Sequence, residues 1–181
     1  MSGRVQVPAA SARIRRGVPG DAFALAEFAS RTFSETFGAE NWEDDLEQHL
    51  KSSFGPAQQG AELIDPDTIT LLAEAEGKFA AFAQVRRSRA PECVTGVAPV
   101  ELWRFYVDRP WQGRGLAQRL MASVREVSVE LGGRTLWLGV WEHNPRAIAF
   151  YQKCGFRDVG SHDFWLGGDQ QTDRVMVTAL G

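Results

Sequence analysis

The sequence predicts a mixed α/β domain, because segments with the two-residue period of strands and segments with the 3.6-residue period of helices follow one another in an irregular order. The clearest strand is Val100 to Val107, where large apolar and polar residues alternate. The clearest helix is Gly115 to Leu131, which Gly132 and Gly133 end. Its apolar residues recur every three or four positions, at Leu116, Leu120, Val124, Val127 and Leu131.

Length and composition favour a single domain. With 181 residues and 44% hydrophobic content, one core can be filled, and we expect residues 1–11 to be a flexible lead-in to a domain at 12–181. The chain has no apolar run of the roughly 18 residues that a membrane helix needs and no secretory signal, so we expect a cytoplasmic protein. The net charge of −3 and the pI near 5.7 argue against binding to nucleic acid.

Before the clearest strand, the chain is predicted to form a strand, two helices and an antiparallel hairpin. Asp21 can cap the first helix, and the four-residue spacing of Trp42, Leu46 and Leu50 after Asn41 indicates the second. The turn of the hairpin is predicted at 76–78. The predicted bounds are a strand at 13–17, a helix up to 37, a short helix around 42–50, and strands at 68–74 and 79–87.

Beyond the clearest helix, the pattern predicts a strand, a helix and two more strands. Their bounds are 135–141, 145–153, about 156–166 and 174–180. The complete order is strand, two helices, three strands, helix, strand, helix and two strands, which is a mixed α/β arrangement. Such a fold alone does not define a function.

The loop between the clearest strand and the clearest helix is the first functional indication. Gly113 and Gly115 would let a ligand approach the backbone closely, and the N–H groups at the helix start favour an anion such as a diphosphate. A turn that needs glycine only for its conformation would give the same pattern. A P-loop and a Rossmann loop are excluded, because neither Gly-Lys-Ser/Thr nor a third glycine at position 118 follows.

Two segments resemble the GNAT superfamily of acetyltransferases. Gln112–Ala117 matches the family pattern Gln/Arg-x-x-Gly-x-Gly/Ala, and Asn144–Phe156 resembles its Asn-x-x-Ala-x-x-Phe-Tyr-x-x-x-Gly-Phe segment. The resemblance extends from about Arg13 to Leu180, since the order of elements is also that of the family. It implies an acyl-CoA N-acyltransferase fold, with a central, mostly antiparallel sheet of about six to seven strands and about four flanking helices.

The resemblance implies an enzyme that transfers an acetyl group from acetyl-CoA to a primary amine by direct attack in a ternary complex. The strand 105–107 would bind the pantetheine arm through its backbone, the amides of 112–117 would hold the pyrophosphate, and Asn144 would bond the arm. The implied cofactor-binding residues are Phe105, Tyr106, Val107, Gln112, Gly113, Arg114, Gly115, Leu116, Ala117, Asn144, Ala147 and Tyr151. No metal is expected, because His49, His143 and His162 lack the spacing of a metal site.

Two further roles concern protons. The resemblance implies that Tyr151 protonates the leaving thiolate; a helix tyrosine packed with Phe150 is the alternative. An ammonium group of pKa about 10 must also lose a proton before it can attack. By the same resemblance Glu101 is the base, either directly or through a water; the alternative is an exposed strand carboxylate paired with Arg104, and Glu142 is the reserve candidate for the base.

The acceptor is indicated by an acidic stretch in the first two helices, which usually line the acceptor side in GNAT proteins. A carboxylate lining would attract a cationic acceptor such as a polyamine, although a solvated helix face explains the same charges. The segments 32–38, 41–46 and 136–144 resemble the bacterial spermine/spermidine acetyltransferase subgroup. The acidic residues are Glu35, Glu40, Glu43, Asp44, Asp45 and Glu47.

Two other functions remain open, namely a binding module that senses acetyl-CoA without catalysis and an acetyltransferase of protein N-termini or lysines. A homodimer formed through the last strands is compatible with the fold. Cys93 and Cys154 are expected to be free thiols. Most of the tryptophans on predicted strands are expected in the core: Trp103, Trp137, Trp141 and Trp165.

Overall fold

The computed structural model describes residues 12–37, 43–166 and 168–181. The predicted lead-in at 1–11 and the predicted part of Asn41 and Trp42 in the second helix lie outside the described residues. The strands are β1 (Arg13–Arg16), β2 (Thr68–Ala75), β3 (Lys78–Arg86), β4 (Pro99–Val107), β5 (Thr135–Trp141), β6 (Arg157–Leu166) and β7 (Asp169–Ala179). The helices are α1 (Ala22–Phe37), α2 (Glu43–Phe54), α3 (Pro56–Ile64), α4 (Leu116–Glu130) and α5 (Pro145–Lys153).

One seven-stranded sheet connects the two halves of the chain, in the order β1-β2-β3-β4-β5-β7-β6. Every pair is antiparallel except β4 with β5, which is parallel. This arrangement confirms the predicted mixed α/β fold. Among the described residues, no helix is long and apolar enough to cross a membrane.

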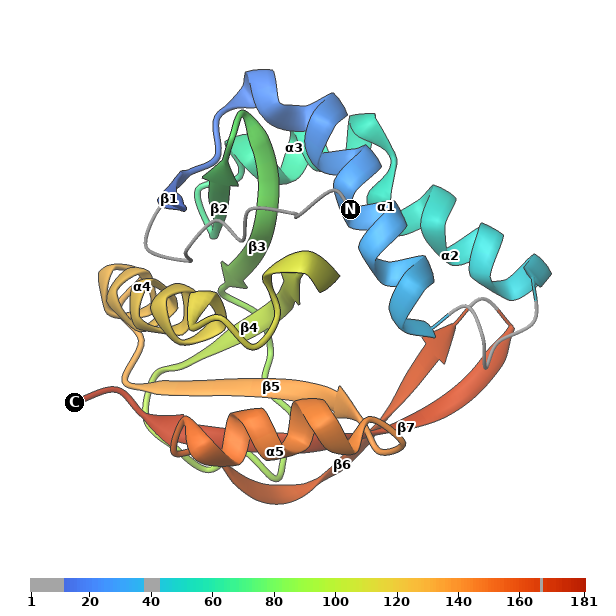
Figure 1. The fold of residues 1–181 in the computed structure, drawn as a ribbon. Helices are drawn as coiled ribbons and strands as arrows, with labels where there is room; N and C mark the ends of the chain where they lie inside the picture. The colour runs from blue at the N-terminus through green and yellow to red at the C-terminus, as the bar shows by residue number, and fades with distance from the viewer. Residues whose placement is uncertain (1–11, 38–42, 167) are drawn as a thin grey trace.

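The helices cover both faces of the sheet (Figure 1). On one face α4 and α5 pack on the larger core cluster, which includes the predicted helix residues Leu116, Leu120 and Val124. On the other face α1, α2 and α3 cover a second cluster centred on Phe28, Phe33 and other aromatic residues. The strands are therefore buried on both faces over much of the sheet.

The parallel pair β4 and β5 is joined at one end only. Its register includes 99–101 on β4 and 135–137 on β5, and the two strands then separate. Within β4 the pairing with β3 shifts, so that Gln84 lies opposite Arg104 and Val85 opposite Leu102. Trp103 is thus the extra residue of a bulge, which turns the side chains that follow it toward the other face. Separation of the strands opens the sheet between two layers of helices.

Three predictions about elements need correction. Helix α3 was not predicted, because its buried positions include Gln59 and Glu62 and therefore show no hydrophobic period. Strand β7 begins at Asp169, five residues before the predicted start, since the residues 169–173 are polar but still pair with β6. Of the four strand tryptophans only Trp137 is buried in the core, and Trp165 is 57% exposed.

Candidate active site

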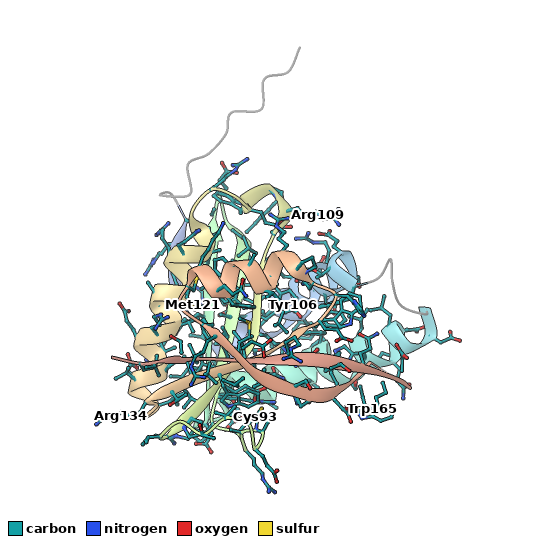
Figure 2. All side chains as sticks on the ribbon, turned by 90° about the horizontal axis from the view of Figure 1, so that it is seen from below. Cys93, Tyr106, Arg109, Met121, Arg134 and Trp165 are labelled. Atoms are coloured by element: carbon teal, nitrogen blue, oxygen red, sulfur yellow. The ribbon has the colours of Figure 1, made fainter. Side chains whose placement is uncertain are left out.

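A cleft of about 820 Å³ lies where β4 and β5 separate. One half is lined by the end of β4, the start of α4 and helix α5, and the other half by α1, α2, β5, β6 and β7. In Figure 2 Tyr106 of β4 lies near the middle of the molecule, while Trp165 lies at the tip of the β6–β7 hairpin on the side of α2. The cleft therefore has two chemically different halves on either side of β4.

The glycine-bearing loop forms one wall of the cleft at the N-terminus of α4. Gly113 and Gly115 have φ angles of 74° and 84°, a left-handed conformation that favours glycine. A Cβ atom at either position would meet nothing within 4 Å. The first helical bond runs from the amide of Arg119 to the carbonyl of Gly115, so the amides of 116–118 are not used by the helix. This end of α4 offers unshielded N–H groups and open space to an anion.

The structure brings together most of the residues predicted to bind the cofactor. The cleft lining includes Phe105, Tyr106, Val107, Gln112, Gly113, Ala117, Asn144, Ala147 and Tyr151. Leu116 is fully buried in the core, so only its amide could reach a ligand. The Cζ atom of Arg114 lies 5.8 Å from the centre of the Trp111 ring, at the outer side of the loop. Gly115, the N-cap of α4, is also absent from the lining, so nine of the twelve predicted residues line one cleft.

Asn144 is the N-cap of α5. Its Oδ1 atom accepts a hydrogen bond from the amide of Ala147 over 3.2 Å. Because the cap uses the oxygen, a hydrogen bond from this side chain to a ligand in the cleft would come from the amide nitrogen. The cap fixes the side chain of Asn144 in the cleft lining, which also includes Trp141 at the end of β5.

Tyr151 of α5 is one of the residues that line the cleft. Only 9% of the residue is exposed, and its ring lies edge-on to Phe105 and Phe156, at centroid distances of 6.2 and 5.7 Å. Burial, followed by the nearby Tyr106, raises the pKa of Tyr151 above its usual range. The phenol therefore carries its proton at neutral pH and is available as a donor.

Glu101, the predicted base, lies at the deep end of the cleft in a polar network. Its Oε2 atom accepts hydrogen bonds from Nε of Arg86 over 2.6 Å and from Oγ of Ser88 over 2.7 Å. The alternative to the base role, an exposed carboxylate paired with Arg104, is wrong, because Glu101 is buried and Arg104 binds Glu62 of α3. Glu101 is thus a buried, ion-paired carboxylate, and its strand face is not exposed.

Trp103 separates the two arginines of this network. The guanidinium carbons of Arg86 and Arg104 lie 3.5 and 3.7 Å from the centre of its ring system. Stacking of a guanidinium on an indole is a favourable cation–π contact. The bulge in β4 that directs Trp103 into the cleft therefore also sets the positions of both positive charges.

The acidic stretch places one of its described side chains in the cleft. Glu35 lines it, 3.1 Å from Nη1 of Arg31. Glu47 pairs with Lys51 on the outer face of α2, where both side chains are mostly exposed, and Asp44 is exposed as well. Glu40 and the side chains of Glu43 and Asp45 lie outside the described residues. Solvation accounts for the described acidic residues of α2.

Sequence reasoning missed several residues of the second half of the cleft. Asp173 of β7 and His162 of β6 line it, together with aromatic side chains from α1, α2 and β6. Asp173 was overlooked because β7 was predicted to begin after it. The signal that could have found this region is Gly139, since a glycine inside a strand often marks the close approach of other atoms. The described residues contain no group of three or more His, Cys, Asp or Glu side chains placed to bind a metal ion.

The sequence model of the acetyltransferase (GNAT) family matches residues 24–156. The chain belongs to the GNAT family of acetyltransferases. An uncharacterized N-acetyltransferase of Lactobacillus delbrueckii subsp. lactis is 32% identical over 159 residues, which are 86% of this chain and 92% of that protein. The spermine/spermidine N(1)-acetyltransferase of Bacillus subtilis is 35% identical over 82 residues, 45% of this chain and 50% of that enzyme.

Among solved structures, the chain is similar to the PaiA N-acetyltransferase of Thermoplasma acidophilum, determined in complex with coenzyme A. The TM-score is 0.76 at 19% identity, over 93% of this chain and 99% of that one. This likeness confirms the predicted GNAT fold. Membership of the family makes the chain an acetyl-CoA-dependent N-acetyltransferase.

The first half of this acetyltransferase's cleft fits acetyl-CoA. The cofactor is an extended molecule with a diphosphate, and the N-terminus of α4 offers amides and positive φ glycines beside open space. The gap between β4 and β5 leaves backbone groups of β4 without a strand partner on that side, so an amide-containing arm can pair with them. Acetyl-CoA would supply the acetyl group as a thioester, and the residues of this half would bind and orient it.

Replacing Gly113 by alanine should weaken coenzyme A binding, by about tenfold or more, because the new methyl group would enter the open space beside α4. The left-handed conformation adds about 1 kcal/mol of strain to the folded state. Gly77→Ala is a matched control, since Gly77 has a φ angle of 71°, lacks neighbours within 4 Å in the same way and lies in the β2–β3 turn. Calorimetric titration should show weaker coenzyme A binding for Gly113→Ala but not for Gly77→Ala. The midpoint of unfolding should decrease by a similar amount in both variants. Equal affinities would contradict the placement of the diphosphate.

Proposed function

We propose that the acetyltransferase acts on a small, cationic primary amine, with a polyamine such as spermidine as the first candidate. We take the half of the cleft lined by α1, α2, β5, β6 and β7 as the acceptor half and the other as the cofactor half; the observation that supports the proposal is a contact across the acceptor half. There α2 contacts β6, and the rings of His49 and Phe164 meet at a centroid distance of 5.7 Å. A peptide substrate needs a groove that is open at both ends, whereas this contact leaves room for a compact acceptor.

Aromatic side chains support an acceptor that combines methylene groups with positive charge. Rings can pack against the methylene groups of a chain and attract an ammonium group to their faces. Two of these rings, Phe37 and Trp141, lie 5.7 Å apart across the cleft mouth between α1 and β5. The aromatic side chains that we assign to the acceptor all line the cleft: Phe33, Phe37, Phe54, Trp103, Tyr106, Trp141 and Phe164.

The relatives add support of a limited kind. The similarity to the spermine/spermidine enzyme covers half of that enzyme, and the segments 32–38 and 136–144 that resemble its subgroup border the acceptor half through Phe33, Phe37 and Trp141. The acidic stretch supports the proposal only through Glu35, which already pairs with Arg31. The choice of a polyamine therefore depends mainly on the shape and the aromatic lining of the cleft.

For the reaction, we propose that the loop 112–117, the end of β4 and Asn144 hold acetyl-CoA, and that Tyr151 is the general acid. Tyr151 supports this role because it lines the cleft and its ring contacts Phe105 of β4, one of the residues proposed to hold acetyl-CoA. Its high pKa makes Tyr151 a weak acid in isolation. The same apolar surroundings, however, also destabilise a thiolate relative to its stability in water. Proton donation is therefore favoured when both groups are buried together.

The experiment that tests the function is release of free thiol from acetyl-CoA with spermidine, spermine, diamines, aminoglycosides and N-terminal peptides, beside a control without amine. We expect polyamines to react and peptides to give the control rate. Preferred turnover of peptides would contradict the proposal. Saturable coenzyme A binding with no release for any amine would favour the alternative of an acetyl-CoA sensor.

A further inference from the structure

A buried carboxylate faces the acceptor half of the cleft from β7. The side chain of Asp173 is only 13% exposed and belongs to the cleft lining. Asp173 lies opposite His162 on β6 and opposite Trp141 on β5. Residues opposite one another on neighbouring strands point to the same face of a sheet, so three strands direct these side chains into one space.

Gly139 creates that space. It is two residues before Trp141 on β5 and therefore shares its face. A Cβ atom at Gly139 would lie 2.8 Å from Nε2 of His162 and 2.9 Å from Oδ2 of Asp173. Any larger residue would displace both groups, so the glycine allows an imidazole and a carboxylate to meet above the middle of a strand.

His162 has an unused nitrogen beside the carboxylate. Its Nε2 atom is buried and has no hydrogen-bond partner among the described residues. It lies 4.0 Å from Oδ2 of Asp173, a distance too long for a direct hydrogen bond. Because a buried polar atom without a partner is costly, the pair is suited to a third group that bonds to both, such as an amine nitrogen or a water.

Asp173 differs from Glu101 in its charge partners. Glu101 is bound to Arg86 and Ser88. Asp173, in contrast, forms no ion pair with any lysine or arginine that the structure describes. A carboxylate whose charge is already balanced by a guanidinium has a low affinity for a proton. A carboxylate without a cationic partner attracts an ammonium ion and gains from taking its proton.

We propose that Asp173 binds the acceptor ammonium group and takes its proton, and that His162 positions the amine. This inference deepens the proposed function and rests on transfer to an amine, but not on the amine being a polyamine. One N–H bond of the ammonium breaks, its proton passes to an Asp173 oxygen, and the electron pair stays on nitrogen. The neutral amine can then form a bond to the acetyl carbonyl carbon while the carbon–sulfur bond breaks.

The protons balance without a further reactant. The amide product must lose a second proton from nitrogen, and the thiolate needs one, which Tyr151 can donate and recover in the proposed mechanism. The proton on Asp173 is released to solvent after the product leaves. The net change is one ammonium and one thioester converted to one amide, one thiol and one proton.

The surroundings of Asp173 suit it to proton transfer at neutral pH. Burial, followed by the charge of Glu142 beyond β5, raises the pKa of Asp173 to about 7. The same cleft lining includes the titratable or charged groups of His162 on β6, Tyr106 and Arg104 on β4 and His49 on α2. Burial, followed by the charge of Arg104, lowers the pKa of His49. Since the carboxylate must be ionised to take a proton, activity should rise with pH through about 7.

The test compares Asp173→Asn with Asp163→Asn, an exposed aspartate of β6 that does not line the cleft. We expect Asp173→Asn to lower kcat/KM for the best amine of the panel by about 100-fold at pH 7.5 and to remove the rise of kcat/KM through pH 7. Asp163→Asn should leave both unchanged. The dissociation constant of coenzyme A, measured by calorimetry, should be the same in all three proteins.

Glu101→Gln separates the two carboxylates. If it abolished the rise through pH 7 while Asp173→Asn kept it, Glu101 would be the base and the inference would be overturned. A titration of the Asp173 carboxyl carbon by NMR, assigned with Asp173→Asn, decides the matter even if every amine of the panel is inert. A midpoint near 7 that moves on addition of spermidine supports the inference, and a midpoint near 4 refutes it. A silent panel would by itself contradict only the choice of acceptor.

Discussion

Glu62→Ala should destabilise the protein by about 3 to 5 kcal/mol, because it leaves the guanidinium of Arg104 buried without its carboxylate. The two side chains are 6% and 5% exposed, and Nη1 of Arg104 donates to Oε2 of Glu62 over 2.5 Å. Burial lowers the pKa of Arg104 against the opposing effect of Glu62, but an arginine stays charged in a protein. Urea unfolding followed by circular dichroism should show the loss.

The control for this prediction is Glu47→Ala. Glu47 also pairs with a cation, Lys51, but the two side chains are 64% and 73% exposed. Water solvates each charge when the pair is broken, so the free energy of unfolding should be the same as that of the unaltered protein within the error of the measurement. Equal effects of the two variants would mean that the Arg104 network contributes no more than a surface pair.

Tyr151→Phe should lower turnover by about 100-fold while leaving the dissociation constant of acetyl-CoA nearly unchanged. The phenylalanine keeps the ring contacts with Phe105 and Phe156 and removes only the hydroxyl group. The cleft should therefore keep its shape. Steady-state kinetics with the best amine and calorimetry with coenzyme A measure the two quantities separately.

Tyr106→Phe is the informative comparison, because the rings of Tyr106 and Phe82 are stacked at 5.3 Å and the substitution preserves that contact. Tyr106 is close enough to Tyr151 to raise its pKa. If Tyr106→Phe lost turnover and Tyr151→Phe did not, the donor would be Tyr106. If neither variant changed turnover by more than about twofold, solvent would protonate the thiolate and no phenol would be required.

Most of the fold could be predicted because its elements show clear local periods. The amphipathic helix α4, the strand β5 and the helix α5 begin and end within a residue or two of the predicted positions. The failures share one cause. Helix α3 and the first part of β7 use polar residues at positions that tertiary contacts bury or pair, for example Glu62 with Arg104, and a hydrophobic pattern does not report such positions.

Two short motifs were enough to predict the family, and most of the residues named from them line one half of the cleft. That half is formed largely by backbone groups of two short continuous segments, 112–117 and 144–156, whose glycines and helix starts act locally. The other half could not be found in this way. Asp173, His162 and Gly139 come from three strands that meet through long-range pairing, and α2 contacts β6 beside them. Strand register and the separation of β4 from β5 place these side chains together, and neither is encoded in any one segment.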